Sequence, residues 1–341
     1  MRRILVHGYF GGRNFGDDLM LLGFLNRHVR DGDSVAIITP DGTRPGHLDA
    51  RVTRAYAKSA KGFLAGLAWA TDFVLCGGTV FHDAYPPERH KRYRKNLIAV
   101  AGLLRIARLA GRRVHLPGIG LGPLRRPLTK AMARIALGSA VHVGLRDERS
   151  MADAAAIGFA KQAVHEADLS AASGLCRSDG PRAGLALSLV APSLISTTDA
   201  PTAERFYAAL AAALAAWQDQ TGEPVTVMVI CVGEADSDVA FAEQFQRMAS
   251  AAGLKDLALY PYDGNPLVMA ARIGAARAMI AMRFHAATVA EKLGTPTFWL
   301  AYQRKVIDGA GELGVDEARV GIPDGEGLSR ITAWLAGFPK V

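Results

Sequence analysis

Short runs of apolar residues, many of them β-branched, alternate along the chain with longer segments rich in alanine and leucine. In the first half these runs predict strands at residues 4–9, 34–39, 73–76, 113–116, 141–145 and 163–166. In the second half they predict strands at residues 185–190, 225–231, 257–260, 278–282 and 297–301. Strands that alternate with helices are typical of parallel sheets covered by helices.

A stretch rich in serine and glycine, residues 172–184, predicts a linker between the two halves. We therefore expect an α/β fold with two doubly wound, Rossmann-like domains, residues 1–172 and 184–325, and a cleft between them. Residues 326–341 are expected to form a C-terminal helix that packs back on the N-terminal domain. The length of 341 residues suits two domains of roughly 100–200 residues each.

The loop after the first predicted strand lies where doubly wound sheets bind ligands, beyond the carboxyl end of a strand. It contains Asn14, Gly16, Asp17 and Asp18 and leads into a predicted helix, whose N-terminus favours anions. A dinucleotide-binding loop would have the pattern G-x-G-x-x-G, but Arg13 replaces the middle glycine. For both aspartates the alternative interpretation is helix capping and compensation of the helix dipole.

Two further loops of the first half carry candidate contacts. Gly77 and Gly78 follow the third predicted strand, and His82 comes shortly after them. Paired glycines also occur in ordinary tight turns, but these lie on the ligand-binding side of the sheet. Arg146 follows the fifth predicted strand. An arginine at the end of a buried strand is costly unless it meets an anion, so we expect Arg146 to bind an anionic ligand.

Three potential cations follow two neighbouring strands of the second half. Arg283 and His285 come after the predicted strand 278–282, and residues spaced i, i+2 on an extended chain point the same way. Lys305 follows the next predicted strand. A single histidine is usually structural, but a histidine beside an arginine at a strand–helix junction favours a functional interpretation. Together these residues predict a site for an anionic small molecule.

Other chemistries lack their sequence signatures. P-loop, GxSxG and HExxH motifs are absent, and the three cysteines have no CxxC spacing. We therefore expect no metal, no cofactor and a reduced, cytoplasmic setting. The N-terminus shows no secretory signal pattern, and charged residues interrupt the longest apolar stretches, so no transmembrane helix is expected.

The net charge of +8 is unevenly distributed. Residues 89–134 contain 13 lysines and arginines and no acidic residue, which leaves 27 basic and 32 acidic residues in the rest of the chain. Within this basic block, Arg89 to Arg108 form a predicted helix, basic at one end and apolar along one face. One interpretation is a core-packed helix with a solvated basic end. The other is peripheral contact with an anionic membrane, at its inner face.

Several motifs occur in order between residues 8 and 305. They are Gly11-Gly12-x-Asn14-x-Gly16-Asp17, Cys76-Gly77-Gly78, Gly118-x-Gly120-x-Gly122-Pro123, Arg146-Asp147-x-x-Ser150, Arg283-Phe284-His285-Ala286, Gly294-x-Pro296 and Tyr302-x-x-Lys305. With these motifs the sequence resembles the polysaccharide pyruvyltransferase family. The resemblance implies a GT-B-type transferase of exopolysaccharide biosynthesis. It also implies transfer of the enolpyruvyl carbons of phosphoenolpyruvate (PEP) to two hydroxyls of one sugar, which yields a pyruvate ketal and phosphate.

The resemblance and the residue chemistry together suggest roles. We expect PEP to be bound by Arg146, Arg283, His285 and Lys305, with His285 as the general acid that protonates the methylene carbon. We expect Asp17 to accept a proton from the sugar or to orient it. Acceptor or loop contacts are expected from Asn14, Gly16, Asp18, Gly77, Gly78 and His82.

Two positions depart from the family pattern. Asp18 stands where members commonly have a longer glutamate. The predicted strand at residues 185–190 ends without the arginine that many members carry there. The shorter side chain of Asp18 reaches less far towards the same partner, and the missing arginine concerns contacts with the acceptor in the second domain.

Other function classes fit parts of the sequence. The same architecture occurs in nucleotide-sugar glycosyltransferases, because fold alone does not fix function. The basic block would suit a nucleic-acid-binding protein, but no recognised motif accompanies it, and we expect no nucleic-acid partner. The presence of Arg283, His285 and Lys305 disfavours an inactive scaffold. The sequence leaves open the acceptor sugar, its nucleotide or lipid-pyrophosphate carrier, and the oligomeric state.

Overall fold

The computed structural model describes residues 1–48, 50–84, 90–176, 180–233 and 237–338. The chain divides into two compact units. Unit 1 comprises Met1–Gly12 and Asp17–Gly174, and unit 2 comprises Arg13–Gly16 and Leu175–Val341. The division after residue 174 lies within the predicted linker. Four residues of the loop after the first strand therefore belong to unit 2.

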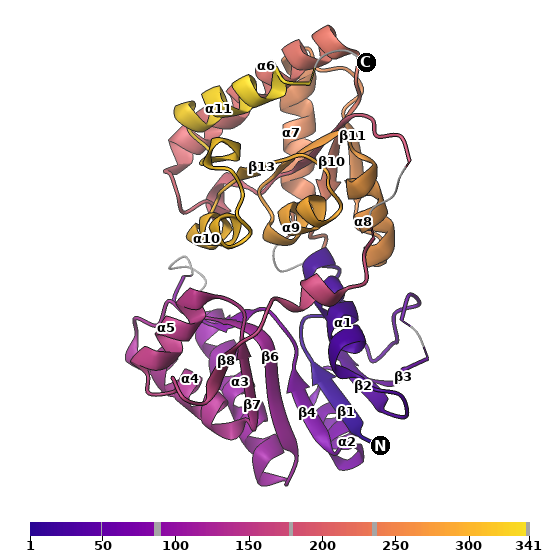
Figure 1. Cartoon of the computed structure of the whole chain (residues 1–341), viewed down its shortest axis with the longest axis vertical. Helices are drawn as coiled ribbons and strands as arrows, with labels where there is room; N and C mark the ends of the chain where they lie inside the picture. Colours follow the sequence, from indigo (N-terminus) through magenta and orange to yellow (C-terminus); the bar gives the residue numbers. More distant parts are fainter. Residues whose placement is uncertain (49, 85–89, 177–179, 234–236, 339–341) are drawn as a thin grey trace. The chain divides into compact units, whose positions relative to one another are not determined.

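Unit 1 is a parallel sheet with helices on both faces (Figure 1). Its strands are β1 (Arg3–His7), β2 (Ser34–Thr39), β3 (Val52–Ala57), β4 (Asp72–Leu75), β5 (Thr79–Phe81), β6 (Arg113–Leu121), β7 (His142–Leu145) and β8 (Ala163–His165). They lie in the order β3-β2-β1-β4-β6-β7-β8, and β5 pairs with β6. The helices are α1 (Phe15–His28), α2 (Ala60–Trp69), α3 (His90–Leu109), α4 (Pro127–Ser139) and α5 (Glu148–Ala156), with a 3-10 turn, η2 (Leu169–Ala172), after them. The strand order reverses between β1 and β4, so the loops after these strands border the ligand-binding switch point.

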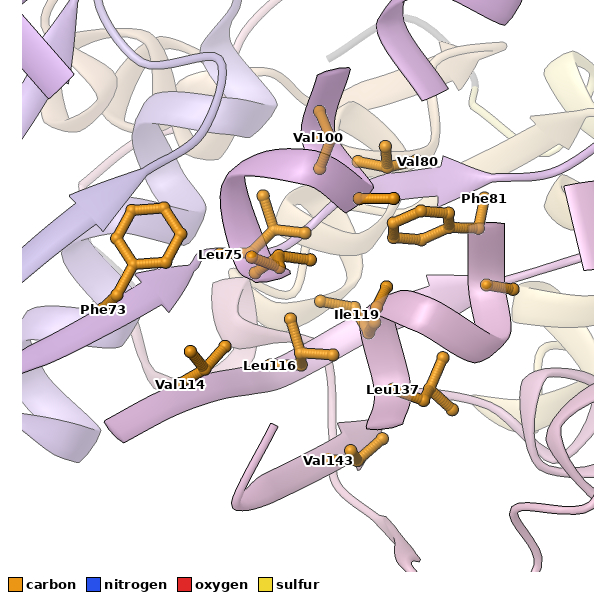
Figure 2. Close-up of a cluster of buried hydrophobic side chains, with 14 of the residues drawn as sticks. Phe73, Leu75, Val80, Phe81, Val100, Val114, Leu116, Ile119, Leu137 and Val143 are labelled. Atoms are coloured by element: carbon orange, nitrogen blue, oxygen red, sulfur yellow. The ribbon is translucent and has the colours of Figure 1, made fainter. Parts of the chain in front are cut away.

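The sheet of unit 1 has two apolar faces because side chains alternate along each buried strand. On one face Leu5 of β1 and Phe73 of β4 join a core cluster with residues of α2, α3 and α4. On the other face Ile4 and Val6 join a second cluster with residues of α1. Figure 2 shows part of the first cluster, with Phe73, Leu75, Val80, Phe81, Val100, Val114, Leu116, Ile119, Leu137 and Val143 labelled. These two layers hold the strand ends, and therefore the loops beyond them, in fixed positions.

Unit 2 repeats the same plan. Its strands are β9 (Leu185–Ser188), β10 (Val225–Val229), β11 (Ala258–Pro261), β12 (Ala278–Ala281), β13 (Thr297–Leu300) and β14 (Val320–Gly321). All are parallel, in the order β11-β10-β9-β12-β13-β14, which places the switch point between β9 and β12. The helices are α6 (Ala200–Thr221), α7 (Val239–Ala251), α8 (Pro266–Ala275), α9 (Phe284–Lys292), α10 (Arg304–Glu312) and α11 (Gly325–Leu335), with 3-10 turns η3 (Pro192–Leu194) and η4 (Glu317–Arg319).

Tyr207 of α6 organises part of the core of unit 2. Its ring centroid lies 4.7 Å from that of Phe241 and 6.0 Å from that of Phe245, both on α7. Its hydroxyl donates to the carbonyl oxygen of Val190 at 2.5 Å, which satisfies the buried polar group. The contact ties α6 and α7 to the loop that follows β9.

The expected fold class is confirmed, because both units are doubly wound α/β domains. Every predicted strand is present; β2 has the predicted bounds, and the others differ from the prediction at one or both ends. Three strands were not predicted. The strand β3 lies at a sheet edge and exposes Thr53 and Arg54, so its sequence lacks a buried apolar run. Strands β5 and β14 have only three and two residues, too few to give a pattern.

The C-terminal helix α11 belongs to unit 2 and packs on elements of that unit, while its expected packing on the N-terminal domain stays a prediction. In Figure 1, α11 lies alongside α6, and the two helices are in contact. Its buried residues Ile331 and Leu335 are four positions apart and share one face. The ring of Trp334 lies 5.8 Å from that of Phe298 on β13. The helix therefore completes the cover of its own sheet. In the described part of the chain, no helix is long and apolar enough to span a bilayer.

Candidate functional site

The loop after β1 is anchored in unit 2 by its residues 13–16. Asn14 forms an antiparallel bridge with Cys231, shortly after β10. The backbone N–H of Phe15 donates to the carbonyl oxygen of Ile230 at 3.1 Å. The side-chain oxygen of Asn14 accepts from the backbone N–H of Gly16 at 3.0 Å. Asn14 thus shapes the turn that leads into α1.

Gly16 lies directly against His285. A Cβ atom on Gly16 would overlap the imidazole Nδ1 of His285, so only glycine permits this approach. His285 lies in the first turn of α9, immediately beyond β12, and its ring contacts that of Phe284 edge-on with centroids 5.3 Å apart. Two predicted site residues, Gly16 and His285, are therefore brought together.

Arg283 stands between β12 and α9 and is held by Asp238. Its Nη2 donates to Oδ1 of Asp238 at 2.5 Å and its Nε donates to Oδ2 at 3.1 Å. The two side chains are 16% and 3% exposed, so the pair is largely removed from water. Asp238 also accepts from the backbone N–H of Cys231 at 3.2 Å. This two-pronged ion pair fixes the direction of the guanidinium group.

Tyr302 places an aromatic ring beside both cations of this edge. It follows β13, and its ring centroid lies 5.9 Å from Cζ of Arg283 and 5.7 Å from Nζ of Lys305. Burial on its own raises the pKa of Tyr302, but the charges of Lys305 and Arg283 lower that pKa more, and it lies below its ordinary value. Lys305 is exposed in the first turn of α10. Since Asp238 balances one of the two cations, Arg283 and Lys305 leave this edge with a positive charge.

Arg146 follows β7 in unit 1 and is also paired with acidic side chains. Its Nη1 donates to Oδ2 of Asp168 at 3.0 Å, and its Nε donates to Oδ2 of Asp147 at 3.4 Å. Its Nη2 donates to the hydroxyl of Thr79 at 3.0 Å. The side chain is only 10% exposed. The anion expected beside this arginine is therefore supplied by the protein, and its contact with PEP stays a prediction.

The paired glycines after β4 form part of the frame around Arg146. Gly77 and Gly78 have φ angles of +61° and +75°, in the left-handed region that favours glycine. The carbonyl oxygen of Gly78 accepts from the N–H of Gly120 at 2.9 Å. A Cβ atom on Gly120 would lie 3.1 Å from Nε of Arg146. A side chain at Gly120 would therefore press against Thr79 and Arg146, whereas one at Gly77 would meet Met20.

The three other predicted residues lie in unit 1. Asp18 is buried, and its Oδ1 accepts from the N–H of Gly11 at 2.9 Å, which closes the loop after β1. Asp17 is half-buried near the end of β4, where burial, followed by the charges of Asp17 and Asp168, raises the pKa of the Cys76 thiol. The ring of His82 lies 5.2 Å from that of Tyr93, and its Nδ1 accepts from the N–H of Ala84 at 3.2 Å.

Asp168 and Asp238 are site residues that the sequence reasoning missed. Each stands one position before a helix, so from sequence alone each would be interpreted as a helix cap. Asp168 does cap η2, because its Oδ1 accepts from the N–H of Ser170 at 2.9 Å. Arg146 and Arg283 at strand ends signal that a carboxylate is needed, but they do not identify it.

Metal-binding side chains do not gather in the described residues: no group of three or more His, Cys, Asp or Glu there could hold a metal ion.

Comparisons with known proteins agree with this fold and these motifs. The sequence model of the polysaccharide pyruvyl transferase family matches residues 14–304. No curated protein sequence matches the chain.

Among solved structures, S. aureus MnaA in complex with UDP has 7% identity and a TM-score of 0.56, over 98% of this chain and 88% of that one. UDP-GlcNAc 2-epimerase from Neisseria meningitidis bound to UDP-GlcNAc has 10% identity and a TM-score of 0.52, over 99% and 92% of the chains. ADP-heptose lps heptosyltransferase II from E. coli has 11% identity and a TM-score of 0.50, over 98% and 99%. At these identities the similarity concerns the fold, which is of the GT-B type.

Proposed function

Because the chain belongs to the polysaccharide pyruvyl transferase family, we propose that it transfers the enolpyruvyl group of PEP to two hydroxyls of one sugar. The products are a pyruvate ketal and inorganic phosphate. The acceptor is a sugar of a polysaccharide or glycolipid precursor.

The positive edge of unit 2 is the observation that carries this proposal. PEP has a carboxylate and a phosphate, and Arg283, His285 and Lys305 lie beyond the carboxyl ends of the adjacent strands β12 and β13. Arginine suits the planar carboxylate and lysine acts as a compact charge for phosphate. Asp238 keeps the guanidinium in a fixed direction before any ligand arrives, which reduces the entropic cost of binding.

The chemistry needs one acid and two nucleophilic hydroxyls. His285 donates a proton to the methylene carbon of PEP, which becomes a methyl group. The first sugar hydroxyl attacks C2, and the second hydroxyl displaces phosphate with cleavage of the C2–O bond. Of the two protons that the hydroxyls lose, one restores His285 and the other leaves with phosphate. Asp17 is the proposed base or orienting group for the sugar.

The direct test is phosphate release from PEP with a panel of sugar acceptors, together with the mass of the products. General acids contribute about 10²- to 10⁴-fold to rate, so His285→Ala should lower phosphate release by at least about 100-fold. His165→Ala is the matched control, because His165 is exposed at the end of β8. Full activity of His285→Ala would remove it as the acid. Turnover of sugar nucleotides without any response to PEP would instead support a nucleotide-sugar glycosyltransferase.

We further propose that the outward face of α3 rests on an anionic membrane surface. The predicted basic helix is α3, and Arg89 lies outside the described residues. The helix carries no acidic residue, and its inner face is buried in the core of unit 1. Its outer face exposes Ile98, Ile106 and Leu109 by 49%, 47% and 71%. The exposed Lys91 and Lys95 complete a mixed apolar and basic surface, which suits anionic lipid.

Sedimentation with phosphatidylglycerol and with phosphatidylcholine vesicles tests this surface. Each lysine near an anionic membrane contributes about 1 kcal/mol, so Lys91→Met with Lys95→Met should weaken binding to phosphatidylglycerol by at least about tenfold. Neutralising the exposed Lys161 and Arg247 is the matched control. Equal loss in both variants, no sedimentation of the unmodified protein, or tighter binding to RNA than to vesicles would contradict the proposal.

A further inference from the structure

Tyr302 is a buried residue at the positive edge of unit 2 and has no part in the chemistry above. It follows β13 and is only 3% exposed. Arg283 immediately precedes α9, and Lys305 lies in the first turn of α10. The helices α9 and α10 are in contact with each other (Figure 1). A buried tyrosine beside two cations calls for an explanation, because phenylalanine would fill the same space without a polar atom.

The backbone of Tyr302 is fixed by the segment that follows β9. Its carbonyl oxygen accepts from the N–H of Ser196 at 2.8 Å and from the hydroxyl of Ser196 at 3.4 Å. The hydroxyl of Thr197 donates to the carbonyl oxygen of the preceding residue, Ala301, at 2.8 Å. Because the backbone is held by these hydrogen bonds and the side chain is buried, the ring of Tyr302 is a fixed support for its neighbours.

Lys305 occupies a position that is unfavourable for a cation. The N-terminus of a helix carries a partial positive charge, and the first turn of α10 contains no acidic side chain. The preceding residue, Arg304, forms an ion pair with Asp308 at 2.9 Å. Lys305 lies beside Tyr302 instead, with its Nζ 5.7 Å from the ring centroid. Holding a flexible ammonium group there requires a group of negative character opposite it.

The hydroxyl oxygen of Tyr302 supplies that negative character. Burial by itself raises the pKa of Tyr302, but the charges of Lys305 and Arg283 and a hydrogen bond from Lys305 lower the pKa below its ordinary value. A lowered pKa of a phenol means that the surrounding cations interact favourably with its oxygen. The guanidinium carbon of Arg283 lies 5.9 Å from the same ring centroid, and Asp238 fixes the direction of that group. One fixed side chain therefore lies beside both cations.

We propose that Tyr302 is a positioning residue, whose hydroxyl holds the ammonium group of Lys305 beside the guanidinium group of Arg283 so that the two cations meet the phosphate and the carboxylate of one donor molecule. This inference rests on the proposed function, because it assigns a role in the binding of PEP. Without the hydroxyl, the lysine side chain would be ordered only when the ligand binds, and that entropic cost would weaken binding. Tyr302 acts through Lys305 and takes no part in proton transfer.

Steady-state kinetics of Tyr302→Phe test this role, because the substitution keeps the ring and removes only the oxygen. The KM for PEP should rise by about tenfold, as expected for the loss of one hydrogen bond to a charged group. The kcat should change by less than about twofold, because the contact positions a binding group and not a reacting one. A role confined to packing would lower stability without a selective change in KM.

Tyr260→Phe is the matched control. Tyr260 is a residue of β11 in the same unit, and Cζ of Arg272 lies 4.8 Å from its ring centroid. It therefore also pairs an aromatic ring with a cation, but on a different strand of the sheet. Tyr260→Phe should leave the KM for PEP and the kcat unchanged. Circular dichroism should show the fold of the unmodified protein in both variants.

Binding of inorganic phosphate, measured by calorimetric titration without PEP, tests the contact independently of catalysis. Tyr302→Phe and Lys305→Met should each weaken phosphate binding by about tenfold. The double variant should bind phosphate as weakly as Lys305→Met alone, because the hydroxyl acts through the lysine.

The proposal is overturned if the unmodified protein does not bind phosphate, if Tyr302→Phe binds phosphate as tightly as the unmodified protein, or if the effects of Tyr302→Phe and Lys305→Met are additive. A loss in Tyr260→Phe equal to that in Tyr302→Phe, or a fall in kcat at unchanged KM, would also overturn it. Failure of the proposed function gives a different result: PEP then yields no phosphate with any acceptor, whereas the phosphate titrations still measure the coupling between Tyr302 and Lys305.

Discussion

Arg146 in unit 1 and Arg283 in unit 2 occupy similar positions. Each follows a buried parallel strand, and each donates to an aspartate that stands one position before a helix. The surroundings differ. Arg146 has a second carboxylate, Asp147, at 3.4 Å, whereas Arg283 has one aspartate and shares the ring of Tyr302 with Lys305.

The difference is one of net charge. In unit 1 two carboxylates surround one arginine, so these three side chains together carry a net negative charge. In unit 2 two cations surround one carboxylate, so the group is positive and attracts a ligand anion. A strand-end arginine that is paired with an aspartate is therefore common to both units. The additional cation, rather than the arginine itself, distinguishes an anion site.

The largest expected effect follows from removing the aspartate of each pair. Removing one partner of a buried ion pair leaves an uncompensated charge and costs about 3–5 kcal/mol, so Asp238→Ala should destabilise unit 2 by that amount. Asp168→Ala should cost less, because Asp147 still faces Arg146. Urea unfolding followed by tryptophan fluorescence measures this, since Trp217, Trp299 and Trp334 report on unit 2.

Asp219→Ala is a suitable control for that experiment. Asp219 pairs with Lys255 at 3.2 Å, but both side chains are more than half exposed, and such pairs contribute little. Equal shifts of the unfolding midpoint in Asp168→Ala and Asp238→Ala would contradict the claim that Asp147 still balances Arg146 when Asp168 is removed.

A second expected effect concerns pH and compares His7 of unit 1 with the exposed His165. Burial, then Lys58, lowers the pKa of His7 from 6.5 to about 4. A histidine with a lowered pKa contributes stability that is complete above pH 6.5 and is lost as pH falls towards 4. The loss amounts to about 3 kcal/mol for this shift. Unfolding by urea between pH 7.5 and 4.5 should therefore show a smaller loss for His7→Gln than for the unmodified protein.

His165→Gln is the matched control, because His165 is exposed at the end of β8. His115, whose pKa is also lowered, first by burial, is present in all three proteins. The difference between variants therefore isolates His7. An identical slope for His7→Gln and the unmodified protein would show that His7 is not held neutral by the fold.

Strands depend on residues that are neighbours in the chain, and they could be predicted from the sequence. Ion pairs between residues that are distant in the chain could not. The strand that ends before Arg283 is recognisable because four consecutive buried residues are apolar. The partners of the two arginines are not recognisable, because Asp168 lies 22 residues from Arg146 and Asp238 lies 45 residues from Arg283. No local pattern encodes such distances.

The glycines of the motifs illustrate the same distinction. The sequence marks Gly16 as part of a loop, but the reason for glycine there is the imidazole of His285, which lies far along the chain. The exposed ring of Tyr9 gave no signal either, because its neighbours Lys58 and Asn96 come from other elements. Candidate residues can be predicted from motifs, whereas their contacts require the fold.

The smallest expected effect compares the same substitution at both arginines under the proposed function. Lysine keeps the charge but cannot bind Asp238 through two nitrogens while facing PEP, so Arg283→Lys should raise the KM for PEP by about tenfold, or about 1.4 kcal/mol. Arg146→Lys should change that KM by less than about threefold, because Asp168 and Asp147 already balance the charge. Steady-state kinetics with PEP as the varied substrate measure both. If Arg146→Lys raised the KM for PEP more than Arg283→Lys, PEP would bind beside Arg146 in unit 1, which the sequence alone allowed. Asp147, the second carboxylate beside Arg146, would then be compatible with anion binding.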